Sequence, residues 1–170
     1  MKTKKVAFLG MCIALSMILS FVESQIPPLA AVPGVKMGLP NIVMVFMLYK
    51  VGAKDTAIVS ILRVILVGIL FGTPLSMIYS LVGAALSLIG MILLKKTNLF
   101  APITVSVAGG ILHNIGQIAT ACIVMETAQI AYYLPVLLIS GTIAGILIGL
   151  TAARILKRRD KMTLYKELSR

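Results

Sequence analysis

The sequence predicts an all-α integral membrane protein, built as one bundle of six transmembrane helices with both termini in the cytoplasm. Three observations lead to this prediction: an apolar composition, six apolar runs, and basic residues concentrated between those runs. Of the 170 residues, 59% are hydrophobic and 12% are charged, and the mean hydropathy is +1.06. Soluble domains are roughly 45–50% apolar and about 25% charged. Because a fold of this size cannot bury so many apolar side chains, the excess is expected to face lipid.

Six apolar runs are candidates for membrane-spanning helices, which need about 20 residues, with a range of roughly 17–25. The predicted spans are 6–22, 37–49, 56–71, 75–94, 101–125 and 131–153. The first follows a basic start that resembles a signal peptide, but no small-x-small cleavage site comes after it, so a retained helix is expected. The second is too short to cross alone unless it begins near Val35 or the bilayer thins locally. The whole chain is expected to form a single transmembrane domain.

The basic residues indicate the orientation of the chain. All but two of the 16 Lys and Arg residues lie in four pieces, namely 1–5, 50–55, 95–100 and 154–170. With six spans and a cytoplasmic N-terminus, all four pieces fall on the cytoplasmic side, as the positive-inside rule requires. The exceptions are Lys36, in the first outer loop, and Arg63, within a span. This clustering, together with the absence of Trp, argues against nucleic-acid binding despite a net charge of +11.

Arg63 is the most informative residue, because an arginine at the middle of a span costs about 2.5–3.5 kcal/mol on insertion scales and should face the interior. No carboxylate lies within any predicted span. Its partner is therefore one of the boundary residues Glu23 and Glu126, or backbone carbonyls and water, or an anionic ligand. The sequence leaves these three alternatives open.

Other polar side chains are expected at bilayer depth. His113, Asn114 and Gln117 share one helix face, and they either line a cavity or satisfy each other structurally. One histidine without a nearby cysteine or carboxylate cannot hold zinc, so no metal is expected. Cys12 and Cys122 lie within apolar runs and are predicted to be small packing residues. Further candidates from other spans are Asn41, Ser76, Tyr79, Ser80 and Gln129.

Two further features bear on function. The segment 23–36 contains three prolines and is rather apolar, so it is either a stiff connector or a lid over a cavity. Small residues recur every four positions, as in the pair Gly10 and Ala14 and in the row Gly141, Gly145 and Gly149. Such rows let helices approach closely, either within the bundle or against a separate membrane subunit.

Four motifs carry a family resemblance: PGVKMGLPNI at 33–42, ILRV at 61–64, YSLVG at 79–83 and HNIGQ at 113–117. Over about residues 6–156 the chain resembles the Gx transporter family, also labelled heptaprenyl diphosphate synthase component I. Pro40 departs from the small residue of the family pattern. The family is similar to the substrate-binding S components of energy-coupling-factor (ECF) vitamin transporters.

The resemblance implies an S-component-like fold in a bacterial-type plasma membrane, with a first loop that closes over the ligand. It also implies that a small-residue face at Gly10 and Ala14 docks a transmembrane coupling subunit, which works with ATPases. The residues that it places near the binding site are Arg63, His113, Asn114 and Gln117.

Two functional hypotheses follow. In the first, the chain is the S-component-like binding subunit of an ECF-type uptake system for a small amphipathic, anionic vitamin or quinone or isoprenoid precursor. Arg63 then pairs with the anion, His113, Asn114 and Gln117 bind its polar edge, Asn41 adds an amide, and Tyr79 packs on a ring. In the second, it is a non-catalytic membrane anchor or accessory subunit of a prenyl-diphosphate synthase or lipid-quinone enzyme. No enzymatic activity or cofactor is expected, because the chain lacks the clustered aspartates that hold magnesium on a pyrophosphate.

Overall fold

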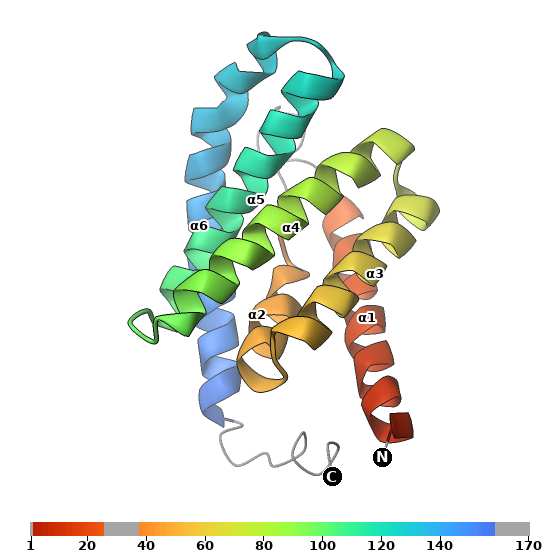
Figure 1. Cartoon of the computed structure of the whole chain (residues 1–170), viewed down its shortest axis with the longest axis vertical. Coiled ribbons are helices and arrows are strands. Elements are labelled where there is room, and N and C mark those ends of the chain that lie inside the picture. Colours follow the sequence, from red (N-terminus) through yellow and green to blue (C-terminus); the bar gives the residue numbers. More distant parts are fainter. Residues whose placement is uncertain (1, 26–37, 159–170) are drawn as a thin grey trace.

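The computed structural model describes residues 2–25 and 38–158, and throughout these ranges the regular structure is helical, without a strand. The elements are α1 (Lys2–Gln25), α2 (Asn41–Lys50), α3 (Ala53–Phe71), α4 (Pro74–Lys96), α5 (Pro102–Val124), the 3-10 helix η1 (Ala128–Tyr133) and α6 (Leu134–Arg158) (Figure 1). The last predicted span, 131–153, thus begins in η1, and residues 23–25 extend α1 instead of opening a loop. The rest of the predicted lid, including Lys36, and the tail beyond residue 158 lie outside the described residues.

Within the described residues, four segments are long and apolar enough to cross a membrane: α1, α4, α5 and the continuous η1–α6 segment. The chain is therefore a multi-pass membrane protein. Helix α2 has ten residues, about 15 Å at 1.5 Å per residue, which is half of a hydrocarbon core roughly 30 Å thick. Helix α3 has 19 residues but carries Lys54, Asp55 and Arg63. The crossing of the membrane by α2 and α3 stays a prediction.

Local sequence sets the helix boundaries around α3. Gly52 precedes α3 with a φ of 127°, a conformation that favours glycine, and so permits the sharp turn from α2. At the start of α4, the Thr73 side chain accepts a hydrogen bond from the Ser76 backbone N–H, and the Ser76 hydroxyl oxygen accepts one from the Thr73 N–H. This capping box, with Pro74 in the first turn, fixes where α4 begins.

Glycines bring α4, α5 and α6 into close contact, and α5 packs extensively against both neighbours. A Cβ built on Gly116 would lie 2.9 Å from the Cα of Gly83, and one on Gly110 would lie 2.7 Å from the carbonyl oxygen of Gly141. A Cβ on Gly145 would approach the Cα of Val107 to 2.6 Å. The Gly141–Gly145–Gly149 row therefore packs within the bundle and not against a separate membrane subunit, which decides between the two alternatives that the sequence left open.

Helix α2 occupies the interior of the bundle, where it contacts α3 and α6 and, less extensively, α1 and α5. Its Val45 and Leu48 belong to a core cluster with Val105 of α5 and Ile148 of α6. The Lys95 Nζ donates a hydrogen bond to the carbonyl oxygen of Leu48 at the C-terminal end of α2, where a cation is favourable. These contacts hold α2 in the interior of the bundle, although α2 is shorter than the neighbouring helices.

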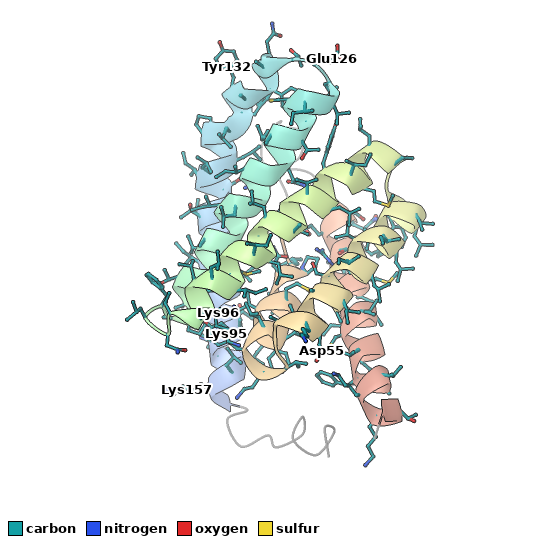
Figure 2. All side chains as sticks on the ribbon, in the orientation of Figure 1. Asp55, Lys95, Lys96, Glu126, Tyr132 and Lys157 are labelled. Atoms are coloured by element: carbon teal, nitrogen blue, oxygen red, sulfur yellow. The ribbon has the colours of Figure 1, made fainter. Side chains whose placement is uncertain are left out.

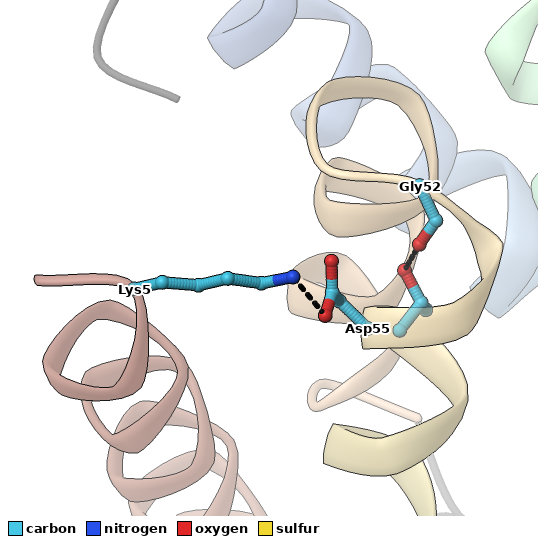
Figure 3. A network of polar contacts seen from close by, with 4 residues as sticks. Lys5, Gly52 and Asp55 are labelled. Atoms are coloured by element: carbon cyan, nitrogen blue, oxygen red, sulfur yellow. Dashed lines mark hydrogen bonds and ion pairs between the residues drawn. The ribbon is translucent and has the colours of Figure 1, made fainter. Parts of the chain in front are cut away.

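The two ends of the bundle differ in charge. Lys5 of α1 and Asp55 of α3 form an ion pair with an Nζ–Oδ1 distance of 2.9 Å (Figure 3). At the same end, Figure 2 shows Lys95, Lys96 and Lys157. Glu126 and Tyr132 lie at the opposite end (Figure 2). The Lys2 end of α1 and the Arg158 end of α6 also share the basic end (Figure 1), an arrangement that fits the predicted orientation, although the compartment each end faces stays a prediction.

Candidate functional site

A cavity of about 210 Å³ lies between the helices, and all six contribute to its lining. The polar side chains that line it are Ser20, Glu23, Ser24, Asn41, Arg63, Ser76, Ser80, Ser87, Ser106, His113 and Asn114. Its volume corresponds to roughly seven molecules of liquid water and is below the about 300–1,000 Å³ of drug-binding pockets. The cavity therefore suits a small ligand, or the polar part of a larger one.

The cavity reaches the end of the bundle that lies away from the basic residues. Ser24 near the end of α1, Gly72 after α3 and Ser76 in the first turn of α4 all line it. Nearby, the rings of Phe21 and Phe71 pack with centroids 5.2 Å apart and join α1 to α3. Because α1 and α3 both start at the Lys5–Asp55 end, a ligand would reach the cavity from the opposite end.

Arg63 lines the cavity from α3. Its Nε is buried and has no hydrogen-bond partner, and it forms no ion pair with any residue in the described part of the chain. Glu23, near the end of α1, attracts it electrostatically and lines the same cavity. Among the alternatives that the sequence left open, Glu23 attracts Arg63 but forms no ion pair with it in the described part of the chain, and Arg63 still lines the cavity.

Helix α5 contributes His113 and Asn114 to the lining. Asn114 is buried, and its Nδ2 donates a hydrogen bond of 2.6 Å to the carbonyl oxygen of Leu137 on α6. That bond uses one donor of the amide and orients the side chain, while the amide oxygen keeps its capacity to accept. From α2, Asn41 reaches the lining beside Gly38, whose φ of 73° favours glycine.

The structure brings together four of the six predicted binding residues, namely Arg63, His113, Asn114 and Asn41. Gln117 and Tyr79 are not among the residues that line the cavity. The Gln117 side chain packs instead over Gly83 at the α4–α5 interface, where a Cβ on the glycine would lie 2.9 Å from its Cγ. The Tyr79 hydroxyl is buried and has no hydrogen-bond partner among the residues that the structure describes. The secondary candidates Ser76 and Ser80 line the cavity, whereas Gln129 is exposed in η1.

Sequence reasoning missed the serines at greater depth and the part that Glu23 plays in the lining. A periodic signal was present: Ser80 and Ser87 are seven residues apart, as are Ser106 and His113. Residues with this spacing lie on the same face of a helix. Extending the polar faces of α4 and α5 by two turns would have identified Ser87 and Ser106.

No group of three or more His, Cys, Asp or Glu side chains within residues 2–25 and 38–158 could hold a metal ion. Cys12 and Cys122 are free, and Cys12 is buried in a core cluster with residues of α2 and α3. The prediction that Cys12 is a small packing residue is confirmed.

The fold and the cavity together define a class: a multi-pass helical membrane protein with a partly polar cavity between its helices. Within that class, the chain belongs to the heptaprenyl diphosphate synthase component I family, whose model matches residues 12–155. The match confirms the family that the motifs indicated and fits a membrane-associated subunit. Searches of curated proteins and of solved structures found no match.

Proposed function

We propose that this protein is a substrate-binding subunit, like an S component, of an ECF-type uptake system for a small anionic molecule. The observation that carries the proposal is the environment of Arg63: a guanidinium between membrane helices, beside a cavity, with an unpartnered Nε. Since a cation at this depth is costly without a partner, an anionic ligand would offset much of that cost. Intramembrane charges of this kind commonly mark a transport pathway or binding site.

The roles of the other residues follow from their places around the cavity. Asn114 is held in position by Leu137, so it presents its amide oxygen to a ligand donor with little loss of conformational freedom. His113 and Asn41 face the same space and would bind polar groups next to the anion. Glu23, whose carboxylate accepts a hydrogen bond from the Gly38 N–H, would compete with the anion for the positive charge of Arg63.

Uptake also requires a side of entry and a source of energy. If the basic end is cytoplasmic, the cavity opens outward, which suits capture from outside the cell. The Gly10 and Ala14 face of α1 is exposed, and a Cβ on Gly10 would meet nothing within 4 Å. That smooth surface is the proposed docking face for a transmembrane coupling subunit, which would bring the ATPases.

The family name favours a second candidate: a non-catalytic anchor or accessory subunit of a prenyl-diphosphate synthase or lipid-quinone enzyme. In that case the basic end of the bundle would dock the enzyme, and Arg63 would belong to an internal polar network. This candidate predicts that no small anion binds and that Arg63 is needed for folding.

Thermal unfolding of the purified protein distinguishes the two candidates. Hexanoate, benzoate and inorganic phosphate serve as probes of the site, and Arg154→Ala, which removes an exposed arginine of α6, is the matched control for Arg63→Ala. Binding predicts that at least one probe stabilises the wild type and Arg154→Ala but not Arg63→Ala. Loss of folding in Arg63→Ala, with no probe acting on the wild type, would favour the anchor. Co-purification with a coupling subunit and two ATPases tests the transport class separately.

A further inference from the structure

Two buried serines in the cavity lining behave differently from most helical hydroxyls in this chain. Ser87 of α4 and Ser106 of α5 are each only 4% exposed, and both line the cavity. Within the described ranges no hydrogen bond is found for either hydroxyl, and neither oxygen is among the fully buried polar atoms that lack a partner. By contrast, Ser16, Ser20, Thr120 and Thr142 each donate to the carbonyl oxygen one turn earlier. A helical serine normally satisfies itself in that way, so these two hydroxyls are left available to a guest.

Ser87 and Ser106 line the same cavity from neighbouring helices, and each packs against a glycine of the next helix, Gly109 of α5 and Gly149 of α6 respectively. A Cβ built on Gly109 would lie 3.2 Å from the Ser87 Oγ, and Gly109 is one turn along α5 from Ser106. Val45, Met91 and Ile148 also line the cavity, and Met91 packs beside Ser87 against Gly109. Both hydroxyls are therefore polar groups in a largely apolar part of the cavity, where a hydrogen bond from a ligand would be favourable.

Contacts along the helices give the depth of this patch relative to Arg63. Gly68 packs on Met77, so Arg63, five residues earlier on α3, lies level with about residue 82 of α4. Ser87 is five residues further along α4, or about 7 Å at 1.5 Å per residue. On α5, Gly83 marks the level of His113, and Ser106 lies seven residues before it, or about 10 Å. Both serines thus lie nearer than Arg63 to the basic end of the bundle, that is, the end at which Lys95, Lys96 and Lys157 lie.

We propose that Ser87 and Ser106 form a second subsite, which binds a neutral hydrogen-bonding group of the ligand, such as a hydroxyl or a carbonyl. The proposal rests on the proposed function, since it assumes that Arg63 binds an anion. The ligand class is then a short bifunctional molecule, with an anionic group at one end and a neutral polar group about 7–10 Å away. A plain hydrocarbon or prenyl chain would leave both hydroxyls without a partner and would be disfavoured.

Pairs of simple carboxylates test this subsite, with dissociation constants measured by titration of the purified protein. The probes are 6-hydroxyhexanoate against hexanoate, in which the hydroxyl can reach the serines, and 3-hydroxypropanoate against propanoate, in which it cannot. The variants are Ser87→Ala/Ser106→Ala, each single substitution, and Arg63→Ala. Ser60→Ala is the matched control, because Ser60 of α3 is 5% exposed and lies outside the cavity lining.

In the wild type and in Ser60→Ala, we expect 6-hydroxyhexanoate to bind roughly fivefold more tightly than hexanoate, the effect of about one neutral hydrogen bond. This gain in affinity from the hydroxyl should vanish in Ser87→Ala/Ser106→Ala. It should also be absent when 3-hydroxypropanoate is compared with propanoate. Equal binding of the long pair to the wild type, or a gain that persists in the double variant, would overturn the subsite. The proposed function survives that result if Arg63→Ala abolishes hexanoate binding. If neither long carboxylate binds to the wild type, the subsite proposal fails, and the proposed function fails with it only if benzoate and phosphate do not bind either.

Discussion

Asn114 of α5 and Leu137 of α6 are joined by a buried hydrogen bond, in which the amide Nδ2 donates to the carbonyl oxygen over 2.6 Å. The Ser140 hydroxyl donates to the same carbonyl oxygen at 3.1 Å. This bond fixes one wall of the cavity to the helix interface behind it. The position of a candidate ligand-binding group therefore depends on the packing of α5 against α6.

We predict that Asn114→Ala lowers the free energy of unfolding by about 1–3 kcal/mol, because a buried carbonyl loses a partner and a small void forms. Denaturant titration of the purified protein measures this loss. Gln129→Ala, at an exposed position of η1, should change stability by less than about 0.5 kcal/mol. An unchanged midpoint for Asn114→Ala would show that the bond does not hold the wall.

The glycine interface predicts opposite effects for two glycine-to-alanine substitutions. Gly145→Ala places a Cβ about 2.6 Å from the Val107 Cα, so the helices must separate, at a cost of about 1–3 kcal/mol. Gly10→Ala meets nothing within 4 Å and gains helix propensity, so it should stabilise by about 0.5–1 kcal/mol. Thermal unfolding of the two variants in one detergent checks both signs, and a similar change in both would contradict the interface described above.

Gly10→Leu tests the docking face on α1. The substitution should not destabilise the isolated protein, since the position is open and leucine has a higher helix propensity than glycine, but it should abolish co-purification with a coupling subunit by breaking the close approach of helices. Ala85→Leu, at an exposed position of α4, is the matched control and should retain the partner. Loss of the partner in both variants, or in neither, would argue against this face.

Arg63→Met separates the stability of the bundle from its proposed function. Replacing a guanidinium that has an unpartnered Nε by an apolar side chain of similar length should stabilise the ligand-free protein, by about 1–4 kcal/mol if the effect resembles that at other buried charges. The same variant should not bind small anions. Unfolding midpoints with and without hexanoate measure both effects. A destabilised variant would mean that Arg63 is held in a structural network, as the anchor hypothesis requires.

The ion pair between Lys5 and Asp55 makes a smaller contribution. Its side chains are 37% and 13% exposed, so a double-mutant cycle with Lys5→Met and Asp55→Asn should give a coupling of about 0.2–1 kcal/mol. Raising the ionic strength to 1 M should reduce this value, because the pair lies partly in solvent. A coupling that is large and independent of salt would place the pair inside a protected environment.

Much of the fold was predictable because membrane helices leave a strong local signal. Long apolar runs, a Pro74 start and lysines at Lys95 and Lys96 located α4 to within two residues at each end. The second span was less accurate, since α2 begins at Asn41 and is held by contacts in the bundle interior. A short helix that is buried on several sides carries an apolar run, but its length does not show whether it crosses the membrane.

The lining of the candidate site was predictable where one residue was chemically out of place, and less so elsewhere. Arg63 and His113 could be selected from the sequence because charge and imidazole are rare at bilayer depth. Gln117, one turn beyond His113, looked equivalent on the same helix, but in the bundle it covers Gly83 instead of facing the cavity. Serines are common in membrane helices. The sequence alone therefore did not distinguish Ser87 and Ser106 as residues of the cavity lining.

By itself, then, the sequence determined that this chain enters a membrane, where its helices run and that one cation among them needs a partner. These properties follow from the transfer of individual side chains between water and lipid, which depends on local composition. Tertiary structure decided which polar side chains share a space and which are covered. That outcome depends on contacts of a few ångströms between residues far apart in the chain, such as Gly83 with His113. The periodicity of a single helix does not predict such contacts.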